Sequence, residues 1–403
     1  MKSNIKDFFT YSSSQIIVLL ISIIISAIWA RNTTQEEYGA YQLVISLIAI
    51  AGIFNFPGLT MAMQLSSAHH KNGNLTIAIK RKVKYSFFSA LFLIFVGVYY
   101  SIFKNNELVT YMLYIAAIAY PLYSLNSLWE SWFTGIRKVK RLSLFFILNS
   151  LISLLIISLG LLVIQNVIVT VFLLLFSIAI FNFIILKFFT LEDKTNEIDE
   201  DTMKYGYALS GAVIISMLVN LDRFIISEYL TLSDVAIYSV AVLFASKVKI
   251  LHATVNKLIA PSILKANSIC DAWNYLKFRL VLIWFGFIVV AIFGFFFIDD
   301  IIILIFSEKY AESAIYAQWL WLIMFSTRPV QYIGNILKSQ KIVRFSYYFE
   351  TINGFGRLAL FLILLPFYKL WGIVYATFII NILTLIYTIT AFNYYYKKEL
   401  SNE

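Results

Sequence analysis

The sequence predicts an all-α polytopic membrane protein with twelve transmembrane helices in two lobes of six, and three observations support this fold class. First, 61% of the 403 residues are hydrophobic and only 13% are charged, which leaves too little polar surface for a soluble protein. Second, apolar runs of about 20 residues recur along the chain, and each is long enough to cross a bilayer. Third, basic residues gather in alternate connections between these runs. The chain is therefore expected to cross a membrane many times.

Twelve apolar runs give the expected helices in order. Their approximate ranges are 11–31, 39–64, 83–103, 109–133, 142–164, 167–190, 204–229, 234–259, 275–297, 311–337, 344–366 and 370–396. The first run is expected to stay in the protein, because it is too long for the apolar region of a signal peptide and lacks an A-x-A cleavage site. An even number of spans leaves both termini on the same side of the membrane.

The 32 Lys and Arg residues indicate which side that is. With both termini in the cytoplasm, 23 of them fall in cytoplasmic segments, Lys82 among them. Only four fall in external segments, namely Arg31, Lys104, Lys309 and Lys369. This bias follows the positive-inside rule and explains the net charge of +10 without a nucleic-acid partner, because the excess is spread over loops and tails.

A duplication of six helices is the predicted domain organisation. Segment 192–204 holds six acidic residues against two Lys and follows the sixth run, as expected of a solvated linker. When the chain is aligned with itself at a shift of 197 residues, Glu37–Tyr41 matches Asp234–Tyr238, and Thr34 matches Thr231. The predicted divisions are an N-terminal lobe at 1–190, an acidic cytoplasmic linker at 191–203 and a C-terminal lobe at 204–403. Parallel repeats of this kind build transporters whose cargo site lies between the halves.

The sequence offers no recognisable enzymatic or metal-binding motif. It contains one Cys, Cys270, and three His without metal-ligand spacing, so neither a disulfide nor a metal site is expected. Walker A, H-E-x-x-H and G-x-S-x-G sequences are all missing. We therefore expect a protein that is not an enzyme and needs no cofactor. Its energy would come from an ion gradient or from the gradient of its cargo.

Four short motifs resemble a known family. They are Thr34–Gln42 (TQEEYGAYQ), Asn220–Ile226 (NLDRFII), Asp234–Tyr238 (DVAIY) and Phe306–Tyr310 (FSEKY). Over essentially the whole chain the sequence resembles the Wzx-type polysaccharide-repeat flippases (O-antigen and capsule) of the multidrug/oligosaccharidyl-lipid/polysaccharide exporter superfamily. The resemblance implies a V-shaped bundle like that of the MATE transporters. It also implies that undecaprenyl-diphosphate-linked oligosaccharide repeat units are moved from the inner to the outer leaflet of the bacterial cytoplasmic (inner) membrane by alternating access, for surface polysaccharide biosynthesis.

Other assignments stay open at this point. A multidrug exporter of the same superfamily shares the fold, although its typical cationic substrates suit a basic cavity poorly. A membrane-embedded glycan polymerase would be equally basic and aromatic, but the longest expected external connection, 298–310, is short for a catalytic domain. The lipid II flippase has a longer, fourteen-helix chain. For the polysaccharide flippase, the expected partners are bacterial membrane lipids, a proton or Na⁺ as the coupling ion, a polysaccharide polymerase and a chain-length regulator.

Basic residues inside predicted spans are the candidate substrate-binding residues. There are five, all in the second half: Arg223, Lys247, Lys249, Arg328 and Arg357. Each costs about 2.5–3.5 kcal/mol at a helix centre on insertion scales, so the bundle must compensate them. One interpretation is a water-filled cavity whose cationic wall binds the diphosphate of the cargo. The other is that each residue pairs with an acid or extends to the interface. We favour the cavity for Arg357 and Lys247, leave Arg223 and Lys249 open, and note that Arg328 can partly reach the cytoplasmic interface.

Acidic residues within the spans are the candidate ion-coupling residues. A carboxylate at membrane depth can exchange a proton or a cation as its surroundings change. Glu350, seven residues before Arg357 on the same helix face, is the first choice, and Asp222 is the second. Glu130, near the cytoplasmic end of the fourth span, is expected to be an interfacial charge. Three prolines within the spans can bend helices for alternating access: Pro57, Pro121 and Pro329.

Overall fold

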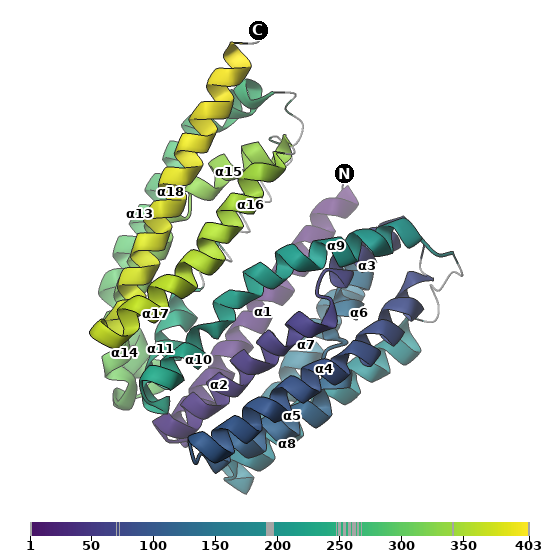
Figure 1. The fold of residues 1–403 in the computed structure, drawn as a ribbon, viewed down its shortest axis with the longest axis vertical. Coiled ribbons are helices and arrows are strands. Elements are labelled where there is room, and N and C mark those ends of the chain that lie inside the picture. The colour runs from purple at the N-terminus through teal and green to yellow at the C-terminus, as the bar shows by residue number, and fades with distance from the viewer. Residues whose placement is uncertain are drawn as a thin grey trace. The chain divides into compact units, whose positions relative to one another are not determined.

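The computed structural model describes the chain except for residues 1, 70, 72, 191–196, 247, 249–250, 253–254, 257–258, 260–262, 264–265, 267, 341 and 402–403. Among the described residues every regular element is a helix, which confirms the predicted all-α class (Figure 1). Nine of the described helices are long and apolar enough to cross a membrane. A tenth span results if the bent pair Glu200–Gly211 and Val213–Tyr229 counts as one. The chain is thus a multi-pass membrane protein, and the total of twelve spans stays a prediction.

Two compact units make up the described chain, Met1–Asn220 (unit 1) and Leu221–Glu403 (unit 2). This division differs from the predicted boundary at 191–203, because helix α9 (Glu200–Met217) packs against α3 (Leu59–Ala68) inside unit 1. The seventh predicted span is therefore shared, and its second part, α10 (Asp222–Tyr229), belongs to unit 2. Acidic composition identifies a connection between helices, but it does not determine which helices pack together.

Unit 1 is a bundle of apolar helices. They are α1 (Lys2–Asn32), α2 (Gln35–Ala51), α3, α4 (Asn74–Phe103), α5 (Glu107–Tyr123), α6 (Asn126–Gly135), α7 (Val139–Ser158), α8 (Val167–Ile184) and α9. Helix α1 packs on α7, α5 packs on α4 and α8, and α3 packs on α6 and α9 (Figure 1). Trp129, Trp132 and Phe133 of α6 are fully buried in an aromatic core. Large apolar side chains such as Phe95 and Leu155 are exposed, as expected of helices that face lipid.

Unit 2 is a second bundle of the same kind. Its described helices are α10, α11 (Leu232–Ala245), α13 (Ile269–Phe306), α14 (Ala311–Thr327), α15 (Val330–Ser339), α16 (Val343–Thr351), α17 (Arg357–Tyr368) and α18 (Leu370–Leu400). Helix α14 packs on α11, α13 and α18, and α10 packs on α11 and α17. Tyr332 and Phe345 are the largest fully buried side chains of one core cluster in this unit. The α10–α11–α17 contact brings together several of the predicted site residues.

Helix boundaries support the predicted duplication. Thr34 and Thr231, which are 197 residues apart in the sequence, cap α2 and α11 through the same reciprocal pattern. The carboxylate of Glu37 accepts a hydrogen bond from the backbone N–H of Thr34 at 2.8 Å. In the same way, the carboxylate of Asp234 accepts a hydrogen bond from the backbone N–H of Thr231 at 3.0 Å. Helices α14 and α15 have the same lengths as α5 and α6, and each begins 204 residues after its counterpart. Helices α7 and α16 also begin 204 residues apart.

The three prolines expected to bend helices all lie at helix breaks. Helix α2 passes into a 3₁₀ turn that ends at Phe56, whose φ of 45° is left-handed, directly before Pro57. Pro121 lies in the last turn of α5, and Pro329 lies between α14 and α15. A proline has no N–H and its ring crowds the preceding turn, so the regular helix is interrupted at or near these points. Three predicted spans, 39–64, 109–133 and 311–337, therefore each contain two helices.

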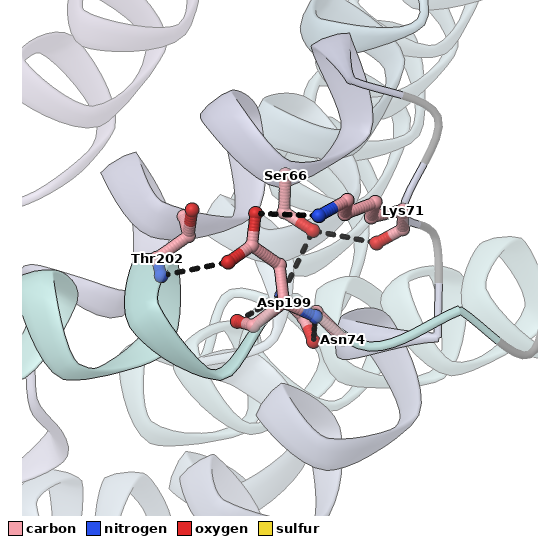
Figure 2. Close-up of polar contacts among 5 residues, drawn as sticks. All are labelled: Ser66, Lys71, Asn74, Asp199 and Thr202. Atoms are coloured by element: carbon pink, nitrogen blue, oxygen red, sulfur yellow. Dashed lines mark hydrogen bonds and ion pairs between the residues drawn. The ribbon is translucent and has the colours of Figure 1, made fainter.

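The end of the acidic segment is attached to the connection between α3 and α4 (Figure 2). Asp199 caps α9 by accepting the backbone N–H of Thr202 at 3.0 Å, and its other carboxylate oxygen lies 3.7 Å from Lys71 Nζ. The buried side chain of Asn74 makes two hydrogen bonds of 3.0 Å to the backbone of Asp199: its Oδ1 accepts from the N–H of Asp199, and its Nδ2 donates to the carbonyl oxygen of Asp199. The hydrogen bond from Thr202, with a smaller effect of Lys71, lowers the pKa of the Asp199 carboxyl. Residues 191–196 of the predicted linker lie outside the described residues.

Candidate functional site

Three of the five predicted basic residues are described by the structure, and all three lie in unit 2 at irregular points of helices. Arg223 is the second residue of α10, Arg328 follows the last residue of α14, and Arg357 follows a π-helical turn, Ile352–Gly356. Lys247 and Lys249 lie outside the described residues. Irregular backbone at membrane depth is tolerated where it is buried in protein or lines a water-filled space. The three arginines thus occupy places where polar groups can be accommodated.

Asp222 and Arg223 form an ion pair between neighbours in the chain. The carboxylate of Asp222 accepts hydrogen bonds at 2.7 Å from the hydroxyl of Tyr238 and from the backbone N–H of Arg223. It also lies 3.9 Å from Nη1 of Arg223, whose Nε donates to Ser239 Oγ at 2.9 Å. Consecutive helical residues point about 100° apart, but this pair meets because Asp222 turns toward the backbone N–H of Arg223. The surroundings of Arg223 are therefore those of a paired cation.

Arg328 and Arg357 are less completely paired. The buried Nε of each guanidinium has no hydrogen-bond partner among the described residues. Nη2 of Arg357 lies 3.5 Å from Asn353 Oδ1, which is long for a hydrogen bond, and its charge is attracted by Asp222. Arg328 is close enough to Arg357 for the two charges to repel each other. Two guanidinium groups with unused N–H donors form a cluster that an anion would stabilise.

The two candidate coupling acids have different surroundings. Glu350 pairs with Lys338 rather than with Arg357: Oε1 and Nζ are 3.7 Å apart, and 38% of the Glu350 side chain is exposed. The π-helical turn between Glu350 and Arg357 changes the helix phase, so a spacing of seven residues no longer predicts contact. Asp222 is 7% exposed and is the carboxylate whose charge acts on Arg357. Asp222 therefore belongs to the arginine cluster, and Glu350 lies outside it.

Lys82 was expected in a cytoplasmic connection, and the structure buries it in unit 1 instead. Helix α4 begins eight residues before it, so the side chain lies two turns inside the helix. Lys82 is 5% exposed, and its Nζ donates to Ser127 Oγ at 2.7 Å. One signal in the sequence could have found it, because Ser86 and Ser89 continue the same helix face at steps of four and seven residues and are buried as well. An apolar-run criterion ends the span at the first cluster of charges and misses this face.

Glu130 was expected at the membrane interface, and it lies partly buried near Lys82. Its carboxylate accepts a hydrogen bond from Asn126 Nδ2 at 2.7 Å and is within electrostatic reach of the Lys82 ammonium group. Among the residues that the structure describes, no three His, Cys, Asp or Glu side chains are grouped as a metal site requires.

Comparisons with known proteins identify the family and the fold. A family model described as polysaccharide biosynthesis protein matches residues 5–266. The lipid II flippase MurJ, in an inward closed conformation, superposes with a TM-score of 0.70 at 15% identity, over 94% of this chain and 87% of MurJ. An inward-facing multidrug resistance MATE transporter of the MOP superfamily gives a TM-score of 0.66 at 12% identity, over 94% and 96% of the two chains. A MOP superfamily transporter from Pyrococcus furiosus, described by the reverse polarity of its binding pocket, also matches. It gives a TM-score of 0.62 at 12% identity, over 96% of each chain. No curated protein matches the sequence.

These likenesses confirm two predictions made from the sequence. At such low identity the solved structures establish the fold, which is the helical fold shared by the MATE and MurJ transporters. The family model covers well over half of the chain. The chain therefore belongs to the polysaccharide biosynthesis protein family, as its resemblance to the Wzx-type flippases implied.

Proposed function

We propose that this protein is a flippase for undecaprenyl-diphosphate-linked oligosaccharide repeat units. It moves them from the inner to the outer leaflet of the bacterial cytoplasmic membrane by alternating access, with both termini in the cytoplasm. The cargo serves surface polysaccharide synthesis, such as O-antigen, in cooperation with a polymerase and a chain-length regulator. The observation that carries the proposal is the pair Arg328 and Arg357, whose buried Nε–H donors have no partner among the described residues. A diphosphate offers the oxygens that these donors lack.

Each charged residue has a separate role in this proposal. Arg357 and Arg328 bind the diphosphate, because they are the arginines with unused donors. Arg223, held by Asp222 and Ser239, sets the position of Asp222 near Arg357. Lys247 and Lys249 remain proposed as further cationic contacts. Together these residues favour an anionic lipid over the cations that multidrug exporters typically carry.

Ion coupling is assigned first to Asp222 and second to Glu350. A carboxylate can couple an ion gradient to transport only if its charge changes the binding of cargo or the balance of conformations. Asp222 meets this condition because it lies within electrostatic reach of Arg357, whereas Glu350 is engaged with Lys338. When the coupling ion, a proton or Na⁺, neutralises Asp222, Arg357 loses its attraction to that carboxylate and becomes available to the diphosphate. Release of the ion would reverse the change.

The test is an export assay in a strain that depends on this chain for surface polysaccharide. Arg357→Ala and Arg328→Ala should each abolish surface polysaccharide while the amount of protein in the membrane stays normal. Arg357→Lys should restore export only in part, because the ammonium group cannot donate two parallel hydrogen bonds. Arg344→Ala, on the exposed face of α16, is the matched control. Normal export in both arginine variants would refute the proposal, and export of cationic dyes by the wild type would favour a multidrug exporter.

A further inference from the structure

We infer that unit 1 contains a second binding site, which recognises a neutral sugar residue of the cargo. The inference rests on the proposed function and adds a subsite to it. Unit 1 contains an open pocket of about 690 Å³ beside the break between α2 and α3. This volume lies within the usual range for small-molecule sites, about 300–1,000 Å³. Its polar lining includes Asn55, Thr60, Lys82, Asn126 and Ser127.

Asn55 carries the strongest evidence for a ligand. Its side chain is only 2% exposed, yet neither its Nδ2 nor its Oδ1 has a hydrogen-bond partner among the described residues. The Oδ1 of Asn126 is also buried without a partner there, while its Nδ2 donates to Glu130. Burying an amide without hydrogen bonds is unfavourable, so such groups are normally satisfied by protein, water or ligand. Two open carboxamides on one pocket suit a ligand that both donates and accepts, as a sugar hydroxyl does.

The charges around the pocket favour a neutral ligand. Lys82 already donates to Ser127 Oγ at 2.7 Å and lies 3.5 Å from Thr60 Oγ1, so part of its donor capacity is used. Glu130 is within electrostatic reach and offsets its charge. In unit 2 the two arginines of the cluster repel each other, which favours an anion. A phosphate would therefore prefer unit 2, and unit 1 offers a hydrogen-bonding surface without excess charge.

The backbone fixes the position of these groups. Helix α2 ends in the 3₁₀ turn Gly52–Asn55, after which Phe56 takes a left-handed conformation and Pro57 prevents the helix from continuing. The carbonyl of Ala51, at the start of this turn, accepts a hydrogen bond from Ser89 Oγ at 2.7 Å. The break thus holds Asn55 at the pocket without leaving that backbone carbonyl unsatisfied. A site built on a fixed break requires little ordering when the ligand binds.

Two lipids test the inference with the full-length protein in nanodiscs. One probe is undecaprenyl diphosphate without sugar, and the other is the lipid-linked repeat unit extracted from cells that lack this chain. Asn55→Leu and Lys82→Met should each weaken binding of the glycolipid about tenfold and leave binding of undecaprenyl diphosphate unchanged. Lys84→Met, on the exposed face of the same helix, should change neither. Ser127→Ala, a milder change at the same site, should weaken glycolipid binding to a smaller extent.

The outcomes separate this inference from the proposed function. If wild type binds both lipids and the variants at Asn55 and Lys82 bind both equally well, the sugar site is refuted and the flippase proposal stands. If the variants lose both lipids to the same extent, their role is structural and the sugar site is again refuted. If wild type binds neither lipid, the proposed function fails and this inference fails with it. Unchanged diphosphate binding in each variant also shows that the variant is folded.

Discussion

The duplication makes certain positions of unit 1 and unit 2 equivalent, and at these positions the first unit carries hydroxyls where the second carries arginines. Ser124 and Arg328 are 204 residues apart, and each directly follows the last residue of an equivalent helix, α5 or α14. Ser153 and Arg357 are separated by the same distance, and each lies four residues after an asparagine. The lengths of α5 and α14 agree although the charges that follow them differ. The fold therefore does not require arginine at these positions, and their presence in unit 2 points to binding.

The backbone differs at one of these positions as well. In unit 1, α7 is a regular α-helix through Ser153 and ends at Ser158. In unit 2 the equivalent helix is interrupted by the π-helical turn directly before Arg357. An extra residue in a turn rotates every later side chain relative to the earlier ones. Charge and backbone thus change together, which is expected if the turn serves to aim the guanidinium group.

Converting unit 2 to the residues of unit 1 should have the largest effect. The double variant Arg328→Ser/Arg357→Ser should lose undecaprenyl diphosphate binding by at least about 100-fold, because each hydrogen bond to a charged group contributes about 1.5–3 kcal/mol. Binding in nanodiscs measures this effect. The exposed Arg344→Ser serves as the control. A double variant that binds the lipid like wild type would show that the difference between the units has no bearing on the diphosphate.

The reciprocal change should damage unit 1 without creating a second diphosphate site. Ser124→Arg places a second cation on the pocket that Lys82 already lines. An uncompensated cation at membrane depth costs about 2.5–3.5 kcal/mol on insertion scales, so the thermal midpoint of the purified protein should fall well below that of Ser124→Asn. Added to the double variant of unit 2, Ser124→Arg should not restore lipid binding. Restored binding would mean that either unit can hold the diphosphate.

The two candidate coupling acids should differ in the size of their effects. Asp222→Asn removes the buried charge that acts on Arg357 and should abolish the pH or Na⁺ dependence of transport. Glu350→Gln breaks a half-exposed ion pair with Lys338, which is worth at most about 1 kcal/mol, so ion dependence should remain. Cysteine labelling after removal of Cys270, the single native thiol, reports the conformational balance of both variants. Loss of ion dependence in Glu350→Gln alone would reverse this assignment.

Composition and the length of the apolar runs were sufficient to predict the class of the fold, because a membrane span needs a long apolar run. They were insufficient for residues near helix breaks. Lys82 lies beyond the apolar run and looked like a loop residue, although the helix extends two turns past that limit. Glu350 was placed on the same helix face as Arg357, seven residues before it, and a π-helical turn that changes this phase cannot be predicted from spacing. Both differences arise where local backbone geometry departs from the average helix, and those departures surround the candidate sites.

The attachment of the acidic segment should show the smallest effect, and its pH dependence has a defined sign. The pKa of Asp199 is lowered in the folded protein, chiefly by the hydrogen bond from the N–H of Thr202. The ionised carboxylate therefore stabilises the folded protein at pH values above the ordinary Asp pKa of about 3.9. The stabilisation is lost as the pH falls through the lowered pKa.

Asp199→Ala removes both the cap and the ion pair with Lys71. Because such a cap is worth about 1 kcal/mol, the variant should speed hydrogen exchange at the start of α9 about fivefold at neutral pH. Asp199→Asn keeps a good capping residue, so its exchange should stay close to that of wild type. After correction for intrinsic exchange, acidification should loosen wild type but leave Asp199→Ala unchanged. Equal exchange in all three proteins would mean that Asn74 alone holds the segment.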